Sequence, residues 1–179
     1  MWGAVVDGFK SLQAENEAER YGISLVGGLY YQEIGQLKTA LEAMLKAAEI
    51  APQEEKHKTN FNLGNIYLGL AAKEEDKEQS EKYYKNSMKQ SLKSEQFARK
   101  LGIDFWQPRF NIGLIYLRTK RYEESIDSFL RAYETAQLTR ENKLFIYFIS
   151  TITGIDKLCE FKPFADKFPD VCESKEKLG

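Results

Sequence analysis

Residues 61–70 read FNLGNIYLGL, and residues 110–119 read FNIGLIYLRT. Six of the ten positions are identical, and Leu63 is replaced conservatively by Ile112. A fainter third copy, LVGGLYY, occupies residues 25–31. Such self-similarity is the signature of a repeat array, in which each unit buries its apolar face only against its neighbours. We therefore expect a protein built from stacked repeats.

A glycine and a tyrosine align the three copies. In each copy the tyrosine follows the glycine by three residues: Gly28 and Tyr31, Gly64 and Tyr67, Gly113 and Tyr116. Two helices approach closely only where a side chain is small, and aromatic rings then fill the wedge between helix pairs. The pattern predicts close helix packing at these glycines and at Ala40, with Phe129 filling space beside them.

Composition limits the function classes. Hydrophobic residues make up 42% of the chain and charged residues 30%, which favours a folded protein over a disordered one. Lys and Arg number 26 against 27 Asp and Glu, so there is no overall attraction to nucleic acid or to an anionic membrane. Four prolines and many good helix formers predict an all-α fold.

The spacing of the copies is uneven. Gly28 and Gly64 are 36 residues apart, whereas Gly64 and Gly113 are 49 apart, and the excess lies in residues 71–83. Asp76 or Ser80 can cap a long helix that runs toward Leu101, with Gly102 as its stop. The second unit is therefore expected to have a lengthened second helix.

Over residues 21–138 the chain resembles the tetratricopeptide repeat family. The pattern of that family joins a Gly-x2-Tyr motif to Ala-x3-Phe and Pro, with a period of about 34 residues. The first unit matches at Gly28, Tyr31, Gly35, Ala40, Ala47 and Pro52, and the third at Ile112, Gly113, Tyr116, Phe129 and Ala132, with Ser125 as the small residue. Ser24, Asn60 and Arg109 stand where the family has tryptophan. The long helix is similar to a variant found in G-protein-signalling scaffolds, kinesin light chains and Rap-type regulators.

The resemblance implies a right-handed α-solenoid of antiparallel helix pairs. We expect a leading helix over residues 1–20, repeats over 21–54, 57–102 and 105–138, and a C-terminal capping helix with a polar tail over 139–179. Whether residues 139–170 form a true fourth repeat is left open.

The resemblance also implies non-catalytic protein–protein interaction, with a peptide in the concave groove lined by the first helix of each pair. The expected binding residues occupy the inward positions of the second and third units or the groove edge: Lys58, Phe61, Asn62, Asn65, Gln107, Phe110, Asn111, Leu114, Leu117 and Arg118. Leu25 and Leu29 line the first unit. The family's carboxylate clamp uses Lys and Asn in the first unit and Lys and Arg in the third, but this chain has Leu25, Leu29, Gln107 and Asn111 at those positions. An acidic chaperone tail is therefore not the expected ligand.

Asn62 and Asn111 occupy the same position in successive repeats. A primary amide carries both a donor and an acceptor, so each can pair with an extended peptide backbone, as in peptide-binding members of the family. The alternative is that each amide caps a carbonyl of a neighbouring helix. Two other functions stay open: self-association through the apolar C-terminal helix, and a chaperone role for a secreted or membrane-bound cargo.

Catalytic chemistry is not expected. His57 is the single histidine, and with no serine or cysteine nucleophile beside it we expect it on the solvated surface. Carboxylates alternate with lysines as on solvated helix faces, and the glycines form no phosphate-binding loop. No metal or cofactor is predicted.

Cys159 and Cys172 have no further Cys or His nearby to complete a zinc site. We predict free thiols, with a disulfide as the alternative. The N-terminus lacks the pattern of a signal peptide, and the apolar stretch at residues 144–155 is too short to span a bilayer. A cytoplasmic protein without membrane insertion is therefore expected.

Overall fold

The computed structural model describes residues 16–176. This part of the chain is helical and contains no strand, and neighbouring helices pack as pairs, which confirms the predicted all-α repeat fold. Most of the expected leading helix over residues 1–20 lies outside the described residues, and Glu17 already belongs to the first helix of the first pair.

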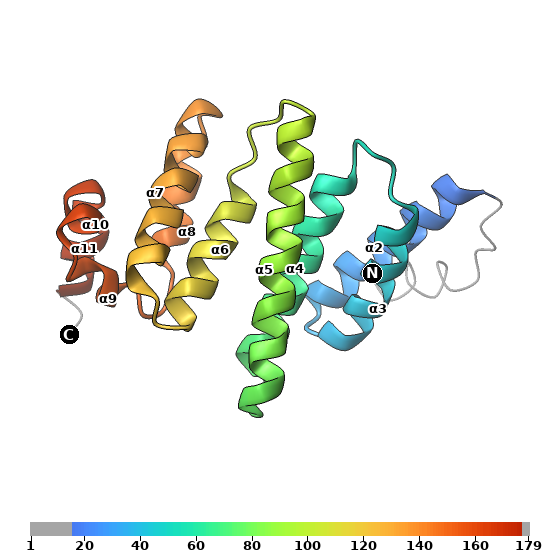
Figure 1. The fold of residues 1–179 in the computed structure, drawn as a ribbon, viewed down its shortest axis with the longest axis horizontal. Helices are drawn as coiled ribbons and strands as arrows, with labels where there is room; N and C mark the ends of the chain where they lie inside the picture. The colour runs from blue at the N-terminus through green and yellow to red at the C-terminus, as the bar shows by residue number, and fades with distance from the viewer. Residues whose placement is uncertain (1–15, 177–179) are drawn as a thin grey trace. The chain divides into compact units, whose positions relative to one another are not determined.

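The chain divides into two compact units, residues 1–101 and 102–179 (Figure 1). The first unit contains α2 (Glu17–Glu33), α3 (Leu37–Ile50), α4 (Lys56–Lys73) and α5 (Lys77–Lys100). The second contains α6 (Gln107–Arg118), α7 (Tyr122–Leu138), α8 (Asn142–Ser150), α9 (Asp156–Cys159), α10 (Lys162–Lys167) and α11 (Pro169–Glu176).

The repeated glycines sit where paired helices touch. A Cβ atom on Gly28 would lie 2.8 Å from Met44 Cε, and one on Gly64 would lie 2.9 Å from Ser91 Oγ. Ser87 closes the second contact, because its hydroxyl donates to the Gly64 carbonyl at 2.8 Å. The predicted packing role of these glycines is confirmed.

The long second pair arises from a missing turn. In the first and third copies the helix ends five residues after the aligned glycine, at Glu33 and Arg118, and the turn that follows contains a residue of positive φ, Gly35 (φ 78°) or Lys120 (φ 60°). The equivalent residue of the second copy, Ala71, is buried inside α4, which continues to Lys73. Both helices of this pair are therefore lengthened.

The predicted ends of α5 are confirmed. Asp76 is the N-cap, with its carboxylate accepting from the Gln79 backbone N–H at 2.7 Å. Ser80, the alternative cap, instead donates to the Ala71 carbonyl at 2.9 Å. Gly102 follows the C-cap with a φ of 67°, the left-handed conformation that favours glycine.

An aromatic core holds the second unit together. Trp106, Phe129, Phe145, Phe164 and Phe168 are fully or almost fully buried in it. The Gly113 and Ser125 pair repeats the contact of the first unit, since a Cβ on Gly113 would lie 2.8 Å from the Phe129 ring and Ser125 Oγ donates to the Gly113 carbonyl at 2.8 Å.

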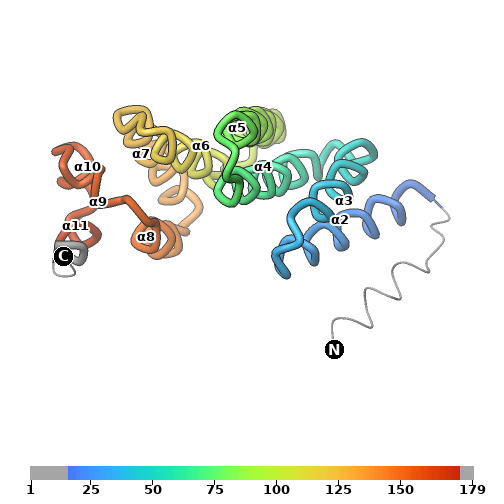
Figure 2. Tube along the Cα trace, turned by 90° about the horizontal axis from the view of Figure 1, so that it is seen from below, coloured from blue at the N-terminus to red at the C-terminus, as the bar shows by residue number. Residues whose placement is uncertain are grey.

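The last three helices fold back on α7 and α8 (Figure 2). Cys159 in α9 and Cys172 in α11 form a disulfide, with their Cα atoms 5.6 Å apart. The prediction of free thiols is therefore wrong and the alternative holds. The turns between the short helices bring the two cysteines within bridging distance, which their spacing in sequence does not reveal.

Candidate functional site

The first unit presents a surface made by α2 and α4. These two helices contact each other, and the hydroxyls of Tyr21 and Thr59 form a hydrogen bond of 3.0 Å between them. On α2, Val26 and Leu29 are exposed to 40% and 41% although both are apolar. On α4, the expected binding residues Phe61, Asn62 and Asn65 are half-buried. We call these five residues the α2–α4 surface.

Asn62 is the amide of this surface that remains open. Its side chain forms no hydrogen bond with any residue the structure describes. Asn60, two positions earlier, is buried and donates to the Lys56 carbonyl at 2.6 Å. Asn60 thus bonds a carbonyl of its own helix, whereas the Asn62 amide caps no carbonyl of a neighbouring helix among the described residues.

Two further polar groups belong to the same unit. Lys58 is exposed and pairs with Glu55 at 3.2 Å, so part of its charge is already neutralised. Gln32, near the end of α2, has a buried Oε1 atom without a donor among the described residues. A buried acceptor without a donor carries a desolvation cost.

In the second unit, three expected binding residues are buried in the protein. Phe110, Asn111 and Leu117 are exposed to only 8%, 5% and 6%. The Phe110 ring packs against Phe129 at 5.2 Å and Phe145 at 5.4 Å between centroids. The expectation that these side chains line an open groove is corrected, because Phe110 and Leu117 belong to the apolar core of this unit and Asn111 is buried as well.

The other expected residues of α6 remain partly accessible. Leu114 and Gln107 are half-buried and Arg118 is exposed. Gln107 Oε1, like that of Gln32, is buried without a donor among the described residues.

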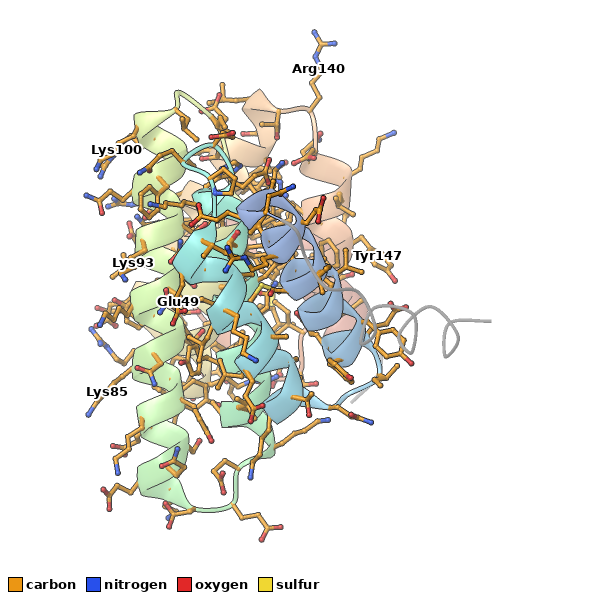
Figure 3. The ribbon with its side chains drawn as sticks, turned by 90° about the vertical axis from the view of Figure 1, so that its right-hand side faces the viewer. Glu49, Lys85, Lys93, Lys100, Arg140 and Tyr147 are labelled. Atoms are coloured by element: carbon orange, nitrogen blue, oxygen red, sulfur yellow. A yellow bond between two sulfur atoms is a disulfide. The ribbon has the colours of Figure 1, made fainter. Side chains whose placement is uncertain are left out.

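Two features of this unit were not predicted from the sequence. Trp106 is 2% exposed and donates its indole N–H to Glu141 at 2.5 Å, which joins α6 to the start of α8. On α8, Leu144, Tyr147 and Phe148 are exposed to 43%, 63% and 42%, while Phe145 is buried. Figure 3 shows Tyr147 projecting from its helix. The i, i+3, i+4 spacing of the exposed residues was a readable signal.

His57 is not the solvated histidine that the sequence suggests. It is 4% exposed at the start of α4, and its own carbonyl accepts from Ser94 Oγ at 2.5 Å. Burial, followed by the charge of Lys58, holds the pKa of His57 below its ordinary value of 6.5. This histidine belongs to the packing of α4 on α5.

No cluster of three or more metal-ligating side chains occurs in residues 16–176. Within the same range, no helix combines the length and the apolar character needed to cross a membrane.

Comparison with known proteins agrees with this architecture. The tetratricopeptide repeat model matches residues 28–54 and 107–137. The chain is a tetratricopeptide repeat protein. Tetratricopeptide repeats generally mediate protein–protein interaction and are typically non-catalytic. No curated protein matches the chain.

Proposed function

We propose that this tetratricopeptide repeat protein binds a segment of a partner protein on the α2–α4 surface. The proposal rests on two exposed apolar side chains of α2, Val26 and Leu29, and on the open amide of Asn62 on α4, the helix that contacts α2. Buried apolar contacts supply most of the affinity in such interfaces, and an amide fixes the register of a bound backbone. The three-repeat division over residues 21–54, 57–102 and 105–138 is part of this proposal.

The bound segment is one with an apolar side chain that covers Val26 and Leu29. Asn62 then pairs with a backbone N–H and C=O of the segment. Because Lys58 is paired with Glu55, we do not assign it the main role in recognition.

The test begins with peptides selected from a display library on the full-length protein. Leu29→Glu should lower the affinity for the selected peptides by about tenfold or more, because binding would bury an unpaired carboxylate at a cost in free energy. Leu45→Glu is the matched control, because Leu45 on α3 is exposed to 39% and lies outside the α2–α4 surface. Equal losses in the two variants, or none in either, contradict the proposal.

Self-association is a second candidate, favoured by the exposed Leu144, Tyr147 and Phe148 on α8. An apolar face of this kind can be covered by a second copy of the chain. Light scattering over a range of concentrations should show a dimer that Tyr147→Glu dissociates. A monomer at every concentration removes this candidate.

A chaperone role for a secreted or membrane-bound cargo is a narrower form of the same binding function. Its test is co-expression, in which the cargo should become insoluble without this protein. A cytoplasmic location also remains a proposal, and the disulfide offers its test. Thiol alkylation in intact cells should label Cys159 and Cys172 in a reducing compartment and leave them protected in an oxidising one.

A further inference from the structure

The outward face of α5 carries five exposed lysines: Lys82, Lys85, Lys89, Lys93 and Lys100. Separations of three, four, four and seven residues keep them on one face of a helix that turns about 100° per residue. They extend over about 27 Å of the helix axis at about 1.5 Å per residue. Figure 3 shows Lys85, Lys93 and Lys100 projecting on the same side, away from α2, α3 and α4. We call these five residues the lysine row.

The lysine row lies opposite the packed face of α5. The buried face includes Ser87 and Ser91, both fully inaccessible to solvent. Lys85, Lys89 and Lys93 are each two residues from one of these serines, which is about 200° around the helix. The lysines therefore contribute nothing to the packing of α5 on α4.

The charges of the row are largely unpaired. α5 contains seven basic residues and only three acidic ones. Lys82 pairs with Glu78 at 2.8 Å, but Lys85, Lys89 and Lys93 have no carboxylate within 4.0 Å among the residues described.

Like charges four residues apart destabilise a helix, and Lys85, Lys89 and Lys93 form two such pairs. Local rules that a protein breaks without a structural gain are expected at functional sites. We propose that the lysine row is a second binding surface, for an acidic helical segment of a partner protein. It is separate from the α2–α4 surface.

The spacing of the row favours a helix as its occupant. Carboxylates at i, i+3 and i+4 on a partner helix repeat at about 4.5–6 Å, the same steps that separate Lys82, Lys85, Lys89 and Lys93 along their axis. One face of an extended strand repeats at about 6.8 Å and falls out of step over this length.

The surroundings of the row argue against a membrane or a nucleic acid. Interfacial helices combine a basic face with inserted apolar residues, and single-stranded nucleic acids stack on aromatic rings. Here Asn86, Gln90 and Gln96 flank or interrupt the lysines. The half-buried Phe97 ring is already covered by the ammonium groups of Lys56 and Lys100, at 5.7 and 5.8 Å from its centroid. Leu92 is the one large apolar side chain that α5 exposes, which provides a single apolar contact beside the row.

The experiment measures fluorescence anisotropy of a labelled helical peptide of about 20 residues, which spans about 30 Å. Its glutamates are spaced at i, i+3 and i+4 on one face, and a second peptide has glutamine in their place. We expect the full-length protein to bind the glutamate peptide at low salt and to release it at high salt. The glutamine peptide should not bind under either condition. Failure to bind the glutamate peptide at low salt overturns the proposal.

The decisive variant replaces Lys85, Lys89 and Lys93 with glutamine and should weaken binding by about tenfold or more. The matched control removes the same charge elsewhere in the first unit, by Lys38→Gln, Lys46→Gln and Lys73→Gln, and should bind within about twofold of the parent. Equal weakening in the two variants shows a net-charge effect and overturns the proposal. Because the lysines of the row repel one another, the melting temperature of the decisive variant should be no lower than that of the parent protein.

Two further measurements fix the class of ligand. Vesicles with anionic lipid and single-stranded DNA are tested under the same conditions, and tighter binding of either through the row overturns the assignment to a protein helix. Leu29→Glu should leave the affinity for the glutamate peptide unchanged. A loss there would place the peptide on the α2–α4 surface and likewise overturn the proposal.

Discussion

Asn62 and Asn111 show how the same residue in two repeats acquires different roles. They stand at equivalent positions, two residues before the aligned glycine, yet Asn62 is half-buried and open while Asn111 is 5% exposed. A buried amide is held by its surroundings, and its loss strands the groups around it. Removal of an amide at the surface leaves no buried group unpaired. The repeat position therefore does not by itself define a binding residue.

The two asparagines should separate cleanly by mutation. Asn111→Ala should lower the free energy of unfolding by about 1–3 kcal/mol, because a buried polar contact is lost. Asn62→Ala should change it by less than about 0.5 kcal/mol, as is usual at the surface, while weakening peptides selected on the α2–α4 surface. Denaturant unfolding of both variants provides the measurement. Equal destabilisation would make both residues structural.

His57 should make stability depend on pH. Burial holds its pKa in the folded state below the ordinary 6.5, so the unfolded chain binds the proton more readily. The contribution of neutral His57 is therefore complete above the ordinary pKa and declines as the pH falls through it toward the lowered value. Urea unfolding at several pH values should show this loss, and His57→Gln should show less of it. The same slope in both proteins would rule the histidine out as the cause.

At the scale of helices, the glycine contacts determine how closely partners pack. Gly113→Ala places a methyl group 2.8 Å from the Phe129 ring, and Phe129 is fully buried and cannot move aside. We expect a loss of about 1–3 kcal/mol from this overpacking.

Gly27 is the control for that substitution, since nothing lies within 4 Å of a Cβ built on it in α2. Gly27→Ala should raise stability by about 0.5–1 kcal/mol through helix propensity alone. Thermal unfolding of the two variants should move in opposite directions. Shifts of the same sign would mean that packing at Gly113 is not tight.

The helices themselves were largely predictable from sequence. The Asp76 cap, the Gly102 stop and the packing glycines follow from local chemistry that acts over a few residues. The burial of Phe110 and His57 was not predictable, because it depends on which neighbours reach them from other helices. The inward positions of the repeat family predict an exposed Phe110. They do not take into account that its ring packs against Trp106 and Phe145 in an aromatic core.

At the scale of the molecule, the two units are stabilised differently. The first unit closes its long pair with serine hydroxyls on helix carbonyls, such as Ser87 on Gly64 and Ser94 on His57. The second unit ends in three short helices of four, six and eight residues, each too short to be stable alone. These helices are stabilised by the packing of Phe164 and Phe168 in the core and by the disulfide between Cys159 and Cys172.

Reduction of that bridge should therefore weaken the second unit selectively. A disulfide that spans 13 residues of sequence is expected to contribute about 3 kcal/mol by restricting the unfolded chain. Trp106 lies in the core of this unit, so its fluorescence reports unfolding there once the other tryptophan is replaced by Trp2→Phe. Adding a reductant should shift the Trp106 transition to lower urea.

The serine contacts of the first unit provide the comparison, because they contain no redox-sensitive group. Hydrogen exchange of α4 and α5 should be the same in reduced and oxidised protein, while α9 to α11 should exchange faster after reduction. A Cys159→Ser and Cys172→Ser double variant should behave like the reduced protein in both units. If reduction loosened α4 and α5 as much as α9 to α11, the bridge would be supporting the whole chain rather than the end of one unit.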